Sequence, residues 1–170
     1  MTKEISVLKI IEGTCVDGVG FRTSIYAAGC GFRCKGCHNP QSWRIENGAW
    51  TPVEDLLEIV AKNKFDDVTF SGGDPLFQVE GFSLLAKKIK AEIGKNIWCY
   101  TGYTFEKIIQ NPNLAQILPY IDVLVDGNFI LKLKNEDLPF RGSENQRLIN
   151  VPESLKRGEV VVLALNNGIN

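Results

Sequence analysis

The chain has 170 residues, with 19 Lys and Arg against 20 Asp and Glu, and a net charge of −1. This length suits one domain over residues 1–170, and the balanced charge argues against nucleic-acid binding through a global basic field. No apolar run approaches the roughly 18 residues of a membrane helix, and the N-terminus does not resemble a secretory signal. We therefore expect a cytoplasmic protein with no membrane or nucleic-acid partner. In that compartment its five cysteines are more typical of metal ligands or buried thiols than of disulfides.

Strand-like and helix-like segments alternate along the chain. Apolar runs predict strands at residues 23–28, 67–70, 96–100, 121–126 and 160–165. A helix is expected from Thr51, which would cap it, through Pro52 and Glu54, which would complete a capping box. Further helices are expected at 79–93, stopped by Gly94, and at 105–110, capped by Thr104, whereas residues 128–146 are polar and irregular.

This alternation predicts an α/β fold with a parallel sheet. A complete eight-fold β/α barrel needs about 250 residues, so we expect an incomplete, open parallel barrel or a short doubly wound sheet. In either fold, functional residues gather at the carboxyl ends of the strands.

Three cysteines follow the first predicted strand in the pattern C-x3-C-x2-C: Cys30, Cys34 and Cys37. Four interpretations compete: a zinc site completed by His38, a haem-attachment sequence, a set of buried or redox thiols, and an iron–sulfur cluster with three protein ligands. The last leaves one iron open, and an open metal position is where a metal does chemistry.

A second motif, Ser71-Gly72-Gly73-Asp74-Pro75, ends the strand at 67–70 on the same side of the sheet. Two glycines expose backbone groups to a close ligand, and Asp74 offers a carboxylate to a cationic one. Together with the cysteine loop one β/α unit earlier, this turn favours the iron–sulfur interpretation.

With these two motifs the chain resembles the radical S-adenosylmethionine enzymes. More narrowly it resembles the family that activates anaerobic ribonucleoside-triphosphate reductases. The resemblance covers nearly the whole chain and includes residues 17–22, 37–43, 71–76, 98–103, 123–127 and 141–146. Two departures from the wider superfamily are Gly36, where many members have an aromatic residue, and Asp74 in place of Glu.

The resemblance implies that Cys30, Cys34 and Cys37 ligate a [4Fe-4S] cluster whose open iron binds S-adenosylmethionine. Reductive cleavage would give methionine and a 5′-deoxyadenosyl radical, which would abstract hydrogen from a glycine on the large catalytic subunit of the reductase. The electron would come from a donor such as flavodoxin or ferredoxin. The cofactors supply the chemistry, and the protein positions them and excludes water.

The same resemblance implies roles for individual side chains. Gly72, Gly73 and Asp74 would hold the methionyl amino group, and Gly36 and His38 would pack near the adenine or the cluster. Tyr26 or Thr101 would line the sugar site, and Asp126 would reach the ribose or methionine. The residues assigned to the partner face are Arg141, Asn145 and Gln146.

Two other functions compete with this interpretation. One is an activase for a different glycyl-radical enzyme, such as pyruvate formate-lyase. The other is a non-enzymatic zinc-binding adaptor whose cysteine loop stabilises a partner interface. Metal content separates the second from the first, because an adaptor would hold zinc and an activase iron with sulfide.

Overall fold

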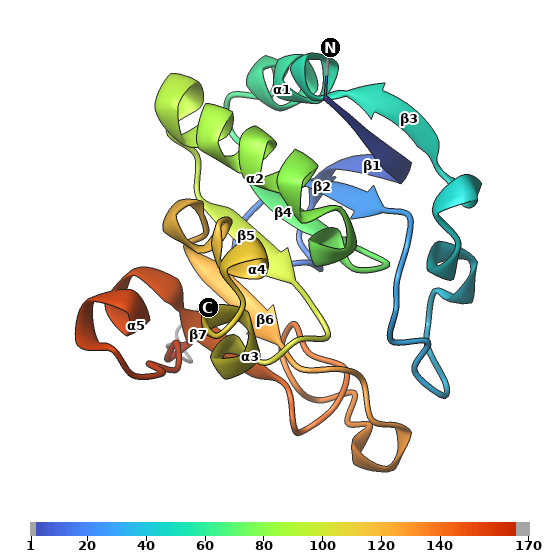
Figure 1. Ribbon diagram of the computed structural model, residues 1–170, viewed down its shortest axis with the longest axis vertical. Helices are drawn as coiled ribbons and strands as arrows, with labels where there is room; N and C mark the ends of the chain where they lie inside the picture. The colour runs from blue at the N-terminus through green and yellow to red at the C-terminus, as the bar shows by residue number, and fades with distance from the viewer. Residues whose placement is uncertain (1–2, 166–170) are drawn as a thin grey trace.

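A computed structural model describes residues 3–165 and contains one seven-stranded sheet with the order β3-β1-β2-β4-β5-β6-β7 (Figure 1). The strands are β1 (Glu4–Thr14), β2 (Arg22–Ala27), β3 (Ala49–Pro52), β4 (Asp67–Gly72), β5 (Ile97–Tyr100), β6 (Val123–Asp126) and β7 (Arg147–Asn150). The four central strands β2, β4, β5 and β6 are parallel, and the strands at both edges are antiparallel to them or to each other. The sheet is open, which confirms the expected α/β fold with a partial, mostly parallel barrel.

Within residues 3–165, five α-helices follow or connect the strands: α1 (Val53–Lys62), α2 (Val79–Lys88), α3 (Phe105–Ile109), α4 (Pro112–Ala115) and α5 (Val151–Arg157). Helices α1 and α2 lie against one face of the sheet (Figure 1), where Phe70 and Phe82 pack with ring centroids 5.0 Å apart. No helix among residues 3–165 is long and apolar enough to cross a membrane.

The two faces of the central strands are both apolar but pack against different neighbours. In β6, Leu124 joins the helix-covered core, whereas Val123 and Val125 join a smaller cluster with Trp98 and Leu148 on the other face. This alternation follows from the two-residue period of a strand.

Arg22, at the start of β2, is 1% exposed and ties the loop before it to the sheet. Its guanidinium lies over the Trp98 ring at 5.3 Å and donates to the Thr69 hydroxyl at 2.6 Å and the Val19 carbonyl at 2.9 Å. Thr69 in turn donates to the Asp17 carbonyl at 2.9 Å. These hydrogen bonds therefore fix the position of the 17–19 loop relative to β2 and β4.

The start of α1 corrects one prediction. Thr51 lies in β3 and pairs with Ile5 of β1, so α1 begins at Val53 with no side-chain cap and no capping box. The N-cap position is Pro52, one residue later than expected, and the Thr51 hydroxyl donates instead to the Ala49 carbonyl at 3.2 Å.

The end of the chain corrects a second prediction. Residues 160–165 do not form a strand; Val162 alone makes a bridge to Ile149 of β7. Strands β1, β3 and β7 and helices α4 and α5 were not predicted from the sequence. The helix from Val79 does continue, through a π-helical turn Ile89–Ile93, to Gly94, whose φ of +77° ends it as expected.

The expected cap of α3 is also different. The Thr104 side chain makes no capping hydrogen bond, and the Phe105 N–H donates instead to the Asp126 carboxylate at 2.8 Å. A residue from the neighbouring strand thus caps this helix.

Candidate cluster and cofactor site

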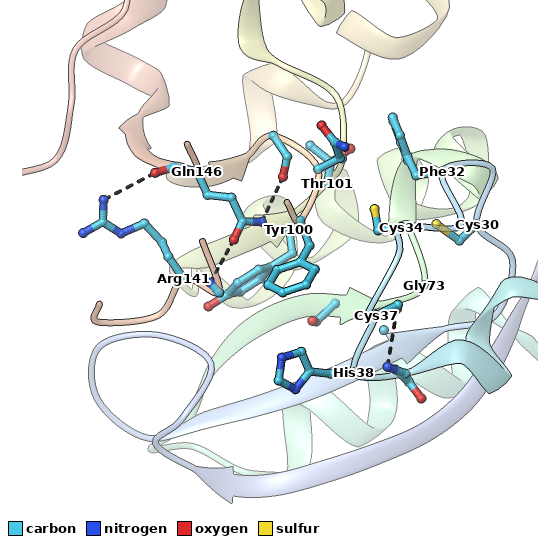
Figure 2. A pocket seen from close by; sticks show the side chains of 18 of the residues that line it. Cys30, Phe32, Cys34, Cys37, His38, Gly73, Tyr100, Thr101, Arg141 and Gln146 are labelled. Carbon is cyan, nitrogen blue, oxygen red and sulfur yellow. Dashed lines mark hydrogen bonds between the residues drawn. The ribbon is translucent and has the colours of Figure 1, made fainter. Parts of the chain in front are cut away.

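A pocket of about 490 Å³ opens where the four parallel strands end (Figure 2). Each strand is followed by pocket-lining residues: Cys30 after β2, Gly73 after β4, Thr101 after β5 and Gly127 after β6. The carboxyl ends of parallel strands meet at one edge of a sheet, which places the two sequence motifs on the same cavity.

All three thiols of the cysteine loop, on Cys30, Cys34 and Cys37, are half-buried and line this pocket (Figure 2). The loop is closed at its base, where the Gly29 N–H donates to the Ser42 carbonyl at 2.7 Å and Cys30 N–H to the Trp43 carbonyl at 3.2 Å. Burial raises the pKa of the Cys30 thiol, so a bound cation is needed to hold it as a thiolate.

The donor set fits an iron–sulfur group, because three thiols on one short loop face one cavity. Among residues 3–165, no three His, Cys, Asp or Glu side chains are gathered closely enough to hold a single metal ion. A cluster of several iron atoms spans a wider set of thiolates than one ion does.

The glycine turn packs directly on the cysteine loop. The Gly73 N–H donates to the Ala27 carbonyl at 2.8 Å and the Asp74 N–H donates to the Gly29 carbonyl at 2.9 Å. A Cβ atom on Gly73 would lie 2.5 Å from the Gly29 oxygen, and Gly72 has a φ of +99°. Both positions require glycine: Gly73 because the backbone of the cysteine loop lies so close to it, and Gly72 because of its positive φ.

Asp74 is 1% exposed and uses both carboxylate oxygens inside the protein. One accepts from the Leu76 N–H at 2.9 Å; the other accepts from the Thr101 hydroxyl at 3.0 Å and the Gly102 N–H at 3.1 Å. Asp74 does not line the pocket, so its geometry is that of a positioning residue which ties the turn after β4 to the turn after β5. Its predicted contact with a methionyl amino group stays a prediction.

Asp74 also gives a testable pH dependence. Desolvation raises the pKa of its carboxyl from 3.8 to about 6, against the opposing effect of its hydrogen bonds. The native protein therefore binds more protons than the unfolded chain between these values, and the contribution of Asp74 to the free energy of unfolding rises as the pH falls from 6 to 4.

We expect Asp74→Asn to abolish this contribution and, at pH 4, where the wild-type carboxyl is also neutral, to lower the free energy of unfolding by roughly 1–3 kcal/mol. In either amide orientation, one backbone N–H, of Leu76 or Gly102, loses its acceptor. Urea unfolding of the apoprotein at several pH values measures both effects, with the exposed Asp137→Asn as control. Identical pH profiles for wild type and Asp74→Asn would contradict the assignment.

The other predicted cofactor residues fall into two groups. Thr101 and His38 line the pocket, with the His38 ring edge-on to Phe129 at 5.6 Å between centroids. Tyr26 and Gly36 do not line it. The Tyr26 hydroxyl donates to the carboxylate of Asp17, which does line the pocket, and this contact together with burial raises the pKa of the tyrosine.

Asp126 lies outside the pocket lining and is fully buried. Its carboxylate forms an ion pair with Arg147 at 2.5 Å in addition to capping α3. Arg147 also contacts Glu106 at 2.8 Å, which lowers the pKa of that carboxyl to about 2. The geometry favours a structural role for Asp126, and its predicted contact with ribose or methionine stays a prediction.

The three residues predicted for a partner face make hydrogen bonds within the 127–146 loop, and their contact with a partner stays a prediction. The Gln146 side chain accepts from the Gly142 N–H at 2.8 Å and donates to the Gly127 carbonyl at 2.9 Å. Asn145 donates to the Asn128 carbonyl at 2.9 Å, and Arg141 donates to the Gln146 carbonyl at 3.3 Å. Arg141 and Gln146 also line the pocket, with the Arg141 guanidinium directed away from the cysteines (Figure 2).

Comparison with known proteins gives a consistent result. The family model of a 4Fe-4S single cluster domain matches residues 16–149. The anaerobic ribonucleoside-triphosphate reductase-activating protein of Enterobacteria phage T4 is 37% identical over 139 residues, 78% of this chain and 86% of the relative. The proteins of the same description from Escherichia coli K12 and Haemophilus influenzae are 37% and 36% identical over 141 residues. Each of these two alignments covers 77% of this chain, and they cover 89% of the Escherichia coli protein and 88% of the Haemophilus influenzae protein.

The chain belongs to this family of reductase-activating proteins. Members of the family are radical S-adenosylmethionine enzymes with a 4Fe-4S cluster, in agreement with the two motifs at the pocket.

Several pocket residues of this family member were not predicted from the sequence. Phe32 packs edge-on against Tyr103 with centroids 4.8 Å apart, and a Cβ on Gly102 would lie 2.5 Å from its ring. The other unpredicted aromatic residues of the lining are Trp43, Tyr100, Phe129 and Phe140. Phe32 and Phe129 could have been found by their place beside Cys30 and Gly127, whereas the others have no local signal.

Proposed function

We propose that this protein activates an anaerobic ribonucleoside-triphosphate reductase by generating a glycyl radical on the large catalytic subunit. The observation that carries the proposal is the backbone contact between the glycine turn and the cysteine loop at one pocket. The bound cluster and S-adenosylmethionine supply the chemistry: reductive cleavage to methionine and a 5′-deoxyadenosyl radical, which takes hydrogen from glycine.

The residues of the chain hold and orient these groups. Cys30, Cys34 and Cys37 would provide the cluster ligands, and the backbone groups of Gly72 and Gly73 would face the methionyl end. The aromatic side chains of the pocket offer an apolar wall for a flat ring such as adenine. Asp74 and Thr101 would act through the turns they connect.

The cell compartment and the electron donor are parts of the same proposal. All five cysteines are free of disulfides, which suits a reducing cytoplasm. A one-electron donor such as flavodoxin or ferredoxin would reduce the cluster there.

The experiment is anaerobic reconstitution with iron and sulfide, reduction with dithionite, and EPR with and without S-adenosylmethionine. We expect a reduced-cluster signal that changes when S-adenosylmethionine is added, together with 5′-deoxyadenosine. After mixing with the reductase large subunit, we expect a glycyl-radical doublet on that subunit. Radical formation on pyruvate formate-lyase and not on the reductase would support the other activase. Uptake of zinc, or a spectrum indifferent to S-adenosylmethionine, would support the adaptor.

A further inference from the structure

The outer side of the cysteine loop carries an uncompensated positive charge. Residues 30–45 include Arg33, Lys35 and Arg44 and no Asp or Glu, although the whole chain has a net charge of −1. Arg44 lies 4.0 Å from Glu46, but Arg33 and Lys35 are exposed and make no ion pair with any residue in the range 3–165. Two free cations therefore flank Cys34, the middle cysteine of the loop.

The neighbouring segment 131–137 is neutral overall, with Lys132 and Lys134 against Glu136 and Asp137, but within the described residues it places one unpaired lysine beside the loop. The 3₁₀ turn Leu131–Leu133 touches the cysteine loop, because a Cβ on Gly36 would lie 2.9 Å from the Leu131 side chain. Lys132 in this turn is exposed and has no ion-pair partner in the described part of the chain. Exposed Ile130, Leu131 and Leu133 place apolar side chains on and beside the same turn.

We call Arg33, Lys35 and Lys132, together with the apolar residues Ile130, Leu131 and Leu133, the basic rim. Exposed apolar patches that are rimmed by polar residues mark protein interaction sites. Arg33 has a φ of +47°, a backbone conformation that non-glycine residues rarely adopt. Such strain is found preferentially at functional loops.

We propose that the basic rim is the docking site for an acidic, one-electron-carrying protein that reduces the cluster, an inference that rests on the proposed function. The pocket side of the cysteine loop must admit S-adenosylmethionine and the glycine of the reductase. An electron carrier therefore needs a second approach close to the cluster, and the outer side of the same loop provides it. One electron leaves the reduced carrier and enters the bound cluster, so the carrier is oxidised and the cluster reduced by one electron each, with no bond made or broken.

The charge arrangement also suits the kinetics of such a partner. Electron-transfer complexes have small interfaces and are short-lived. Their formation therefore depends on long-range electrostatic attraction more than on buried area. Three free cations would raise the association rate of an acidic carrier, and salt would weaken the effect.

The test is charge reversal with a matched control. Lys35→Glu/Lys132→Glu removes two cations of the basic rim, and Lys62→Glu/Lys64→Glu makes the same charge change on exposed residues before β4, away from the pocket edge of the sheet. Both reconstituted variants are compared with the wild type. The rate of cluster reduction is followed with reduced flavodoxin as the acidic carrier, over a range of salt, and with photoreduced 5-deazaflavin as a small uncharged reductant.

We expect Lys35→Glu/Lys132→Glu to slow reduction by flavodoxin roughly tenfold at low salt and to flatten its salt dependence. Reduction by deazaflavin, iron content and affinity for the reductase large subunit should stay as in the wild type. The control variant should behave as the wild type with both reductants.

Equal flavodoxin kinetics in the two variants would overturn the proposal. So would lower affinity for the reductase with unchanged flavodoxin kinetics, which would make the basic rim part of the reductase interface. Failure of the proposed function is distinct: S-adenosylmethionine would then not be cleaved in any of the proteins with either reductant.

Discussion

Replacing Cys34 by Ala is expected to remove most of the iron that the reconstituted protein binds and to lower S-adenosylmethionine cleavage by more than about 100-fold. Loss of a residue that merely supports a metal ligand costs 10–100-fold, so loss of a ligand should cost more. Cys34 is half-buried on a loop that is closed by backbone hydrogen bonds at its base, and the fold should therefore survive the change. Iron and sulfide content, EPR and 5′-deoxyadenosine yield measure the effect.

The matched control is Cys15→Ala. Cys15 is exposed and lies outside the pocket that the three loop cysteines line, so its replacement should leave iron content and cleavage as in the wild type. A Cys34→Ala protein that keeps its iron and an EPR signal responsive to S-adenosylmethionine would overturn the ligand assignment. Equal losses in both variants would point to general damage by thiol removal.

Replacing Gly73 by Ala is expected to damage the site through its backbone. The added Cβ would lie 2.5 Å from the Gly29 oxygen and 2.9 Å from the Ser42 oxygen, and neither backbone atom can move without moving the cysteine loop. Overpacking of this kind destabilises by roughly 1–3 kcal/mol. A displacement near 1 Å at a reactive site costs about 100-fold in rate, and we expect a loss of this order in S-adenosylmethionine cleavage.

Gly31→Ala serves as the control within the same loop. No atom lies within 4 Å of a Cβ built on Gly31, so the variant should retain wild-type stability and cleavage. Urea unfolding and the cleavage rate, measured side by side, test both variants. If Gly73→Ala cleaves S-adenosylmethionine at the wild-type rate, the contact between turn and loop does not position the cofactors.

The alternation of the central strands with helices and the place of the two motifs could be predicted because both depend on local patterns. A short apolar run such as residues 23–28 forms a buried strand, and the polar, cysteine-rich segment after it must leave the sheet at the carboxyl end. The cysteine spacing and the Gly-Gly-Asp turn are likewise local. For this reason Cys30, Cys34, Cys37, Gly72 and Gly73 could be placed on one pocket before the fold was known.

The edges of the sheet could not be predicted in this way. Strand β3 exists because residues 49–52 pair with residues 4–7, and the paired residues lie 42 to 48 positions apart in the sequence. Thr51 has the local features of a helix cap, but in the folded chain it pairs with Ile5 of β1. Strand β7 is similarly defined by its pairing with β6 and not by its own four residues.

The roles of the charged side chains could be predicted even less well, because they depend on tertiary structure. Asp74 and Asp126 both follow the end of a strand or close one, and from the sequence both were predicted to face the cofactor. Three donors from the turns after β4 and β5 surround Asp74, and Arg147 of β7 pairs with Asp126. A buried carboxylate is stable only where donors converge on it, and those donors come from segments far apart in the chain.

The sequence by itself thus determined the chemistry of this protein: three thiols and a glycine turn at the ends of neighbouring parallel strands, with the family that they indicate. The tertiary structure alone decided which carboxylates are buried and hydrogen-bonded outside the pocket and which aromatic side chains line it. It also decided that the 131–133 turn lies against the cysteine loop, at Gly36. The physical reason is that ligand type and the alternation of strands and helices follow from local residue patterns, whereas burial, hydrogen-bond partners and surface charge depend on contacts between distant segments.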